Sequence, residues 1–76
     1  MKKVLSVHNL KNKPILVCEN FPVGVTIKIV CENGVTQCKD FEVAPSMTLY
    51  DVGKNIGILI KEPIDFKTLG NPLEVE

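Results

Sequence analysis

The sequence predicts a mainly β protein, a small single-domain barrel or sandwich of about five to seven short strands around a hairpin at residues 25–43. The first observation is composition, because 10 valines and 7 isoleucines stand against a single alanine. β-branched side chains lose rotamer freedom in a helix but pack well on a pleated sheet. The second is the alternation of apolar and polar residues between clusters of Gly, Pro and Asn. The third is length, because 76 residues supply only one hydrophobic core.

Residues 3–8 predict the first strand, with Leu5 and Val7 on the core face. The following segment, residues 9–14, contains two asparagines and Pro14. These residues favour a turn and interrupt a regular ladder of hydrogen bonds.

An uninterrupted apolar run at residues 15–18 predicts a second strand that is covered on both faces. The bend predicted after it covers residues 21–24, where Pro22 is excluded from a central strand position.

The clearest element is the hairpin, which folds at Asn33-Gly34. An Asn-Gly pair between alternating runs is the strongest short-range signal for a β-hairpin. The first arm alternates cleanly, and one of its faces carries Val25, Ile27, Ile29 and Cys31.

Two registers compete for this hairpin. A two-residue turn at Asn33-Gly34 pairs Glu32 with Val35 and sets Lys28 opposite Lys39, which brings two like charges together. A one-residue change of register moves every side chain of the second arm to the other face, so the choice matters.

The alternative places Gly34 as a left-handed bulge residue and pairs Cys31 with Val35. Lys28 then faces Cys38 in place of a second lysine. The pairing pattern favours this bulged hairpin, which predicts Cys31 inside the core and Cys38 on the more solvated face.

The segment that follows supports two interpretations. Ser46 can cap a short helix over residues 46–56, although Gly53 in its interior disfavours a helix. The competing interpretation is a strand at 48–52 and a turn, and residues 56–61 are expected to form a strand in either case.

Toward the carboxyl end, Ile64, Phe66 and Leu69 can form one more edge strand or an extended arm. We expect residues 1–70 to make up a single β-rich domain. Residues 71–76 are expected to form a loose tail until they meet a partner.

Residues 41–52, which follow the Asn33–Gly34 hairpin, resemble the opening of ubiquitin-like β-grasp domains. In that family a hairpin leads through a Pro-Ser-x-Thr-Leu turn into a helix, so the resemblance implies an α+β alternative with one short helix. It covers residues 25–57. The chain departs from the family because residues 1–24 precede the hairpin. The ending at residues 73–76 also lacks the Gly-Gly of conjugated members, so modifier chemistry does not carry over.

Charge argues against nucleic acid as a partner. The net charge is zero, and all 9 basic residues are lysines. Binding to phosphates normally shows a basic excess and uses arginine for bidentate contacts. The amino-terminal apolar run is too short for export or for crossing a membrane, so we expect a cytoplasmic protein.

Residue types with catalytic or metal-binding chemistry are sparse. Cys18, Cys31 and Cys38 contain no Cys-x-x-Cys pair, which argues for reduced thiols and against zinc. The single histidine, His8, has no nucleophile placed beside it by sequence, and no phosphate-binding glycine loop occurs. We therefore expect no enzyme activity, no cofactor and no metal.

The remaining expectation is a non-enzymatic module, of the accessory or inhibitor type, that binds another protein or itself through sheet edges. The alternative is an oligomeric protein that binds a small molecule or nucleotide in pockets at subunit junctions. Candidate contact residues for a ligand or partner are Lys28, Cys38, Tyr50, Lys54 and Phe66.

Overall fold

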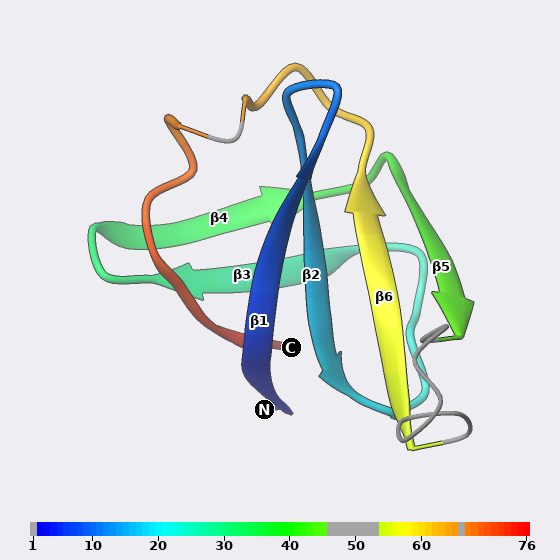
Figure 1. The fold of residues 1–76 in the computed structure, drawn as a ribbon. Helices are drawn as coiled ribbons and strands as arrows, with labels where there is room; N and C mark the ends of the chain where they lie inside the picture. The colour runs from blue at the N-terminus through cyan, green and yellow to red at the C-terminus, as the bar shows by residue number, and fades with distance from the viewer. Residues whose placement is uncertain (1, 46–53, 66) are drawn as a thin grey trace.

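The computed structural model describes residues 2–45, 54–65 and 67–76. These residues form one antiparallel sheet with the strand order β4-β3-β7-β1-β2-β6-β5. Figure 1 shows that the sheet curls into a half-barrel, in which β1, β2 and β6 cross over β3 and β4. The predicted small all-β domain is therefore confirmed. The strands are β1 (Lys2–Leu10), β2 (Lys13–Glu19), β3 (Ile27–Cys31), β4 (Gly34–Cys38), β5 (Phe41–Pro45), β6 (Asn55–Ile60) and β7 (Pro72–Val75).

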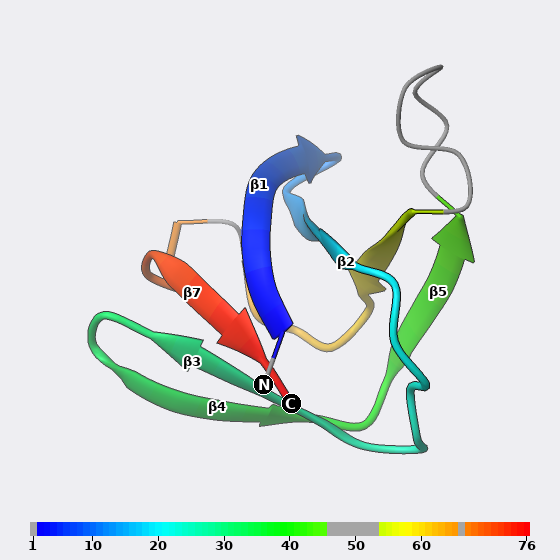
Figure 2. The same cartoon turned by 90° about the horizontal axis from the view of Figure 1, so that it is seen from below.

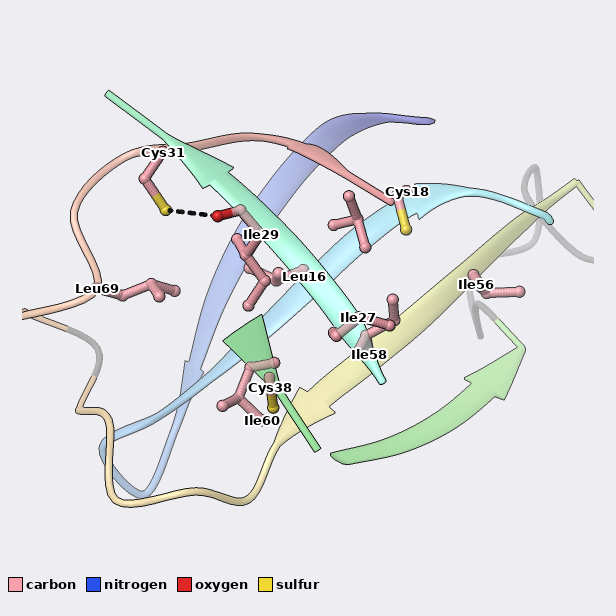
Figure 3. Packing of buried hydrophobic residues seen from close by; sticks show 11 residues of the cluster. Leu16, Cys18, Ile27, Ile29, Cys31, Cys38, Ile56, Ile58, Ile60 and Leu69 are labelled. Carbon is pink, nitrogen blue, oxygen red and sulfur yellow. Dashed lines mark hydrogen bonds between the residues drawn. The ribbon is translucent and has the colours of Figure 1, made fainter. Parts of the chain in front are cut away.

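The core lies on the concave face of the curled sheet, where alternate residues of several strands meet (Figure 3). Burial of one large aliphatic side chain contributes about 1.5–3 kcal/mol, so this single cluster is the main source of stability. Because only one face is rich in isoleucine, the sheet has to fold over itself to bury that face. The buried cluster consists of Leu16, Cys18, Ile27, Ile29, Cys31, Cys38, Ile56, Ile58, Ile60, Leu69 and Val75.

The first strand is confirmed, but Leu5 does not lie in the core. Val4 and Ser6 pair with neighbouring residues of β2, so Leu5 is an extra residue at a bulge in β1. Its side chain is 50% exposed, while Val4 and Val7 pack against the core. Simple alternation cannot reveal such a bulge.

The turn between β1 and β2 consists of Lys11 and Asn12, both with positive φ (49° and 65°). Positive φ at both central residues is the requirement of a tight two-residue hairpin turn. Pro14 was predicted to interrupt the ladder, and this is wrong because Pro14 lies inside β2 and is buried.

The position of Pro14 explains why β2 tolerates it. The N–H of Asn20 donates to the carbonyl of Lys54 at 3.0 Å, so the even-numbered residues of β2 point their backbone groups toward β6. Pairing between β2 and β6 ends at Ile15 and Leu59, one residue short of Pro14. The missing N–H of the proline therefore removes no pairing that the sheet contains.

The β3–β4 hairpin is present, but its register differs from both predicted ones. The loop is Glu32–Asn33, and Cys31 pairs directly with Gly34 in a ladder without a bulge. Gly34 keeps a positive φ of 137°, yet it is a paired strand residue rather than part of the turn.

This register places apolar side chains of both arms in the core. Ile27 pairs with Cys38, so Cys38 lies on the buried face, and the prediction that it occupies the more solvated face is wrong. Cys31 is buried as predicted. Lys28 faces Gln37, which avoids both the lysine pair and the predicted contact with Cys38.

The second arm of the hairpin ends at Cys38 rather than at Val43. The chain bends at residues 39–40, and β5 then pairs with β6 at the opposite end of the sheet. The two edge strands β4 and β5 are therefore consecutive in the chain but lie at the two ends of the strand order (Figure 2).

The predicted strand at residues 56–61 is confirmed as β6, with alternating buried residues. The possible helix at 46–56 cannot include residues 55–56, which belong to β6, and residues 46–53 lie outside the described part of the chain. The residues that are described contain strands and turns and no helix, so they do not establish a β-grasp arrangement. They accordingly offer no helix of the length and hydrophobicity needed to cross a membrane.

The prediction that residues 71–76 form a loose tail is wrong. β7 lies between β3 and β1, and Val75 is 0% exposed. Pro72 and the charged Glu74 made this strand hard to predict from the sequence, although Val75 supplies the apolar side chain that the sheet buries. Leu69 is also buried, but it lies in the connection between β6 and β7 and not in a strand.

The central place of β7 predicts the effect of two substitutions. Val75→Ala should lower the free energy of unfolding by about 2 kcal/mol, because it removes buried methyl groups and leaves a cavity. Leu73→Ala changes an exposed side chain of the same strand and should have an effect of less than about 0.5 kcal/mol. Denaturation in urea measures both, and equal small effects would show that β7 does not pair in solution.

Candidate functional site

The structure separates the predicted contact residues. Lys28 is exposed on the convex face of β3, whereas Cys38 is buried on the concave face at the end of β4. Lys54 is exposed in the turn before β6. Tyr50 and Phe66 lie outside the described residues. Among the described members, no two come together in one site.

All three cysteines are buried free thiols. Burial, with a smaller contribution from the carboxylate of Glu19, raises the pKa of Cys18 to about 11. Burial and the nearby Glu62 raise the pKa of Cys38 to about 11, and burial raises the pKa of Cys31 as well. A thiol acts as a nucleophile in its deprotonated form, so these groups are unsuited to covalent chemistry near neutral pH. Within the described ranges, no three His, Cys, Asp or Glu side chains are arranged to hold a metal ion.

His8 does have a hydroxyl neighbour, which sequence reasoning missed. Ser6 Oγ and His8 Nε2 lie 3.0 Å apart on the exposed side of β1. Residues two apart in a strand share a face, so this spacing could have revealed the pair. A catalytic Ser–His pair is normally oriented by a third group. Over the residues described, no carboxylate is hydrogen-bonded to His8, so the pair lacks that orienting group.

The sheet edges are the other candidates, and the β3–β7 pairing shows which way their backbone groups point. The N–H of Lys28 donates to the carbonyl of Glu76 at 3.2 Å, and the N–H of Glu76 donates to the carbonyl of Lys28 at 2.9 Å. Successive residues of a strand point these groups to opposite sides. Ile27 and Ile29 therefore point theirs toward β4.

The same alternation identifies the free groups of β4. Thr36 pairs with Ile29, so its backbone groups face β3. Val35 and Gln37 consequently direct their N–H and C=O groups away from the sheet, and β4 is an end strand that lies outermost beyond β3 in Figure 2. Both side chains are exposed, Val35 at 64%. The β4 edge, which we define as residues 34–38, contains neither a charge nor a proline.

The β5 edge is protected in ways that the β4 edge is not. The N–H of Lys61 donates to the carbonyl of Asp40 at 2.9 Å, so the backbone groups of Asp40 face β6. The backbone groups of every second residue from 41 to Pro45 therefore point away from the sheet. Pro45 has no N–H to offer at that edge. Glu42 adds a charge to the strand and forms an ion pair with Lys61 at 2.9 Å. Proline and charge are the usual protections of an edge strand against pairing with another chain.

A third free segment lies along β1, which pairs with β7 only at Lys2 and Lys3. Figure 1 shows the connection between β6 and β7 passing on that side of β1. From this connection Leu69 reaches into the core (Figure 3).

The end of β4 is held by a carboxylate. Oε1 of Glu62 accepts the N–H of Lys39 at 2.6 Å and that of Asp40 at 3.2 Å, at the bend into β5. These two hydrogen bonds are the main reason that the pKa of Glu62 lies below its ordinary value.

The start of β4 is held at the hairpin loop. The N–H of Glu32 donates to the carbonyl of Asn71 at 3.0 Å, and the Asn71 side-chain amide donates to the Glu32 carboxylate at the same distance. Gly70 has a φ of 85°, and a Cβ there would lie 2.7 Å from Oδ1 of Asn33. The β4 edge is therefore short and fixed at both ends.

Of the contact residues expected from the sequence, only Cys38 belongs to the β4 edge, and its side chain is buried, so the exposed part of this edge was not predicted. A signal for it was present, because residues 33–38, between Glu32 and Lys39, carry no charge. That stretch becomes an edge only through the bend at residues 39–40, which no local pattern indicates.

No protein-family model, no curated protein sequence and no solved structure matches this chain.

The raised thiol pKa values predict slow modification. At pH 8 the three cysteines should react with a disulfide reagent far more slowly in the folded protein than in denaturant, because the thiols are buried and protonated. The release of the coloured thiolate measures the rate. Rapid reaction of even one equivalent without denaturant would contradict the buried positions.

The Glu62 contacts predict a pH dependence. Because the folded-state pKa of Glu62 is depressed, its contribution to stability is present above the unfolded-state pKa, about 4.3, and disappears as pH falls through the folded-state pKa. Glu62→Gln should therefore be less stable than the wild type at pH 7, and the difference should shrink on acidification.

The matched control is Glu19→Gln, which changes an exposed carboxylate without a hydrogen bond to the described residues. Thermal unfolding from pH 7 to pH 3 compares the variants. A constant difference between wild type and Glu62→Gln over this range would show that the carboxylate charge does not hold the bend.

Proposed function

We propose that this domain is a non-enzymatic protein-interaction module, of the accessory or inhibitor type, that binds a partner protein or itself by adding a strand to its sheet. The observation that carries the proposal is the β4 edge, where the outward backbone groups of Val35 and Gln37 pair with none of the described residues and lie beside exposed side chains. An unprotected edge strand readily accepts another strand.

The energetics of strand addition suit this edge. Each backbone hydrogen bond contributes about 0.5–1.5 kcal/mol net, and Val35 offers an apolar side chain next to those bonds. The ties at Glu62 and Asn71 hold β4 in an extended conformation before binding. A preformed strand loses less conformational freedom on binding, which favours affinity.

The chemistry of the remaining residues supports a binding role over catalysis. The thiols have raised pKa values, and the Ser6–His8 pair has no orienting carboxylate among the described residues. For the ligand-binding alternative, β7, β1 and β2 separate the strand of Lys28 from β6, which follows Lys54. No observation favours a small-molecule site that uses both lysines.

Site-specific photocrosslinking tests the proposal. A benzophenone amino acid at position 35 lies at the β4 edge, and the same group at position 28 lies one strand inward on an exposed position. In cells that make the protein, position 35 should give discrete covalent adducts with a protein partner or a second copy, and position 28 should give few.

A pair of variants makes the assignment specific. Gln37→Pro removes an outward N–H without touching the β3 ladder and should abolish the adducts at position 35, whereas Gln37→Ala keeps the N–H and should preserve them. Circular dichroism confirms that both variants fold. Adducts that survive Gln37→Pro, or a lack of adducts at position 35, would exclude strand addition at β4.

A further inference from the structure

We propose that Asn33-Gly34 is a site of spontaneous deamidation, which the contact of this loop with Gly70 and Asn71 keeps slow while the domain is folded. Water is the co-reactant, and the product is aspartate or isoaspartate at position 33. This inference concerns the loop of the β3–β4 hairpin and does not depend on what binds at the β4 edge.

Asn33 combines the two features that the reaction requires. Of the asparagines in the sequence, it alone is followed by a glycine. Because glycine has no Cβ, nothing hinders the approach of its backbone nitrogen to the side chain of the preceding residue. Asn33 and Gly34 are both exposed, so water reaches them.

The chemistry uses these two residues and water alone. The backbone nitrogen of Gly34 forms a bond to Cγ of Asn33, and the bond from Cγ to Nδ2 breaks. The amide nitrogen leaves as ammonia and carries away the proton that the Gly34 nitrogen gives up. Water then opens the five-membered imide ring at either of its two carbonyl carbons, which yields aspartate or isoaspartate.

The folded loop restrains the attacked group. A Cβ on Gly70 would lie 2.7 Å from Oδ1 of Asn33 and 2.9 Å from both Cγ and Nδ2, so the whole side-chain amide lies against this glycine. Attack turns the planar Cγ into a tetrahedral centre, which needs room on both sides of the amide plane. Gly70 occupies one of those sides, so the side chain has to move away before the ring can close.

The folded loop also restrains the attacking nitrogen. Cys31 pairs with Gly34 across a loop of two residues. In such a turn the N–H of the fourth residue is directed at the carbonyl of the first. The proton that Gly34 must lose therefore faces the carbonyl of Cys31, and the turn has to open before the nitrogen can attack.

Two hydrogen bonds keep the loop against Gly70. The N–H of Glu32 donates to the carbonyl of Asn71 at 3.0 Å, and the side-chain amide of Asn71 donates to the Glu32 carboxylate at 3.0 Å. They join the residue before Asn33 to the residue after Gly70. Asn33 therefore reacts from a locally opened loop, at a rate that follows the population of the open state.

The reaction makes this opening permanent. In isoaspartate the backbone runs through the former side chain and gains a methylene group, so a loop of two residues no longer fits the Cys31–Gly34 register. Aspartate adds a negative charge directly after Glu32, and like charges disfavour the close packing of this loop. Modified chains should consequently lose the contact with Gly70 and Asn71.

Peptide mapping by mass spectrometry tests the inference, because deamidation at position 33 appears as a gain of one mass unit during incubation at neutral pH. Asn71→Ala removes one of the two hydrogen bonds and should accelerate the reaction of the folded protein several-fold. Glu32→Gln keeps an acceptor for that bond and should stay near the wild-type rate. In denaturant all three proteins should react at one common, faster rate, because the loop is open in each.

A further variant separates opening of the loop from global unfolding. Ile58→Val removes a buried methyl group from β6, where Ile58 pairs with Leu16 and Val43 away from the hairpin loop, and it should accelerate the reaction less than Asn71→Ala does. Equal rates for the wild type in buffer and in denaturant would overturn the protection of Asn33. No acceleration in Asn71→Ala, or an equal acceleration in Ile58→Val, would overturn the role of the Gly70–Asn71 contact.

Discussion

The need to bury one isoleucine-rich face governs this structure. Ile27 and Ile29 of β3 and Ile58 and Ile60 of β6 lie on the same side of one sheet, far apart in the strand order. With no second layer among the described residues, these side chains leave water only if the sheet curls until its two halves pack on each other. The bulge in β1 and the bend at residues 39–40 allow the sheet to curl, because flat, regular strands could not bend far enough.

The same curl explains why the sheet keeps two end strands. A half-barrel has two ends, whereas a closed barrel has none, so β4 and β5 each pair with only one of the described strands. Pro45 and the Glu42–Lys61 pair restrict the β5 end, whereas β4 itself contains neither a proline nor a charge. Glu62 links the two ends, because its carboxylate holds the short segment that joins them.

Alternation in the sequence was sufficient to predict most strands and the all-β class, because side chains on a pleated sheet repeat every two residues. The register of the strands and the topology of the sheet could not be predicted from this alternation. The Asn-Gly signal predicted a hairpin but placed its loop one residue late, since packing of Cys38 into the core determined the pairing. Val75 was missed because a strand that inserts between two others depends on residues distant in the chain. The β4 edge was missed for the same reason, because a strand is an edge only by what does not pair with it.

The insertion of β7 between β1 and β3 has a consequence for how the chain folds during its synthesis. β7 is the last described strand to leave the ribosome, and until it arrives the sheet lacks the strand that joins its two halves. Pairings between such distant segments form slowly, because a long loop must close first. The strands β1 and β3 meanwhile expose unpaired backbone groups, which makes the nascent chain vulnerable to misassembly. Folding of this domain is therefore expected to finish only after translation has passed residue 75.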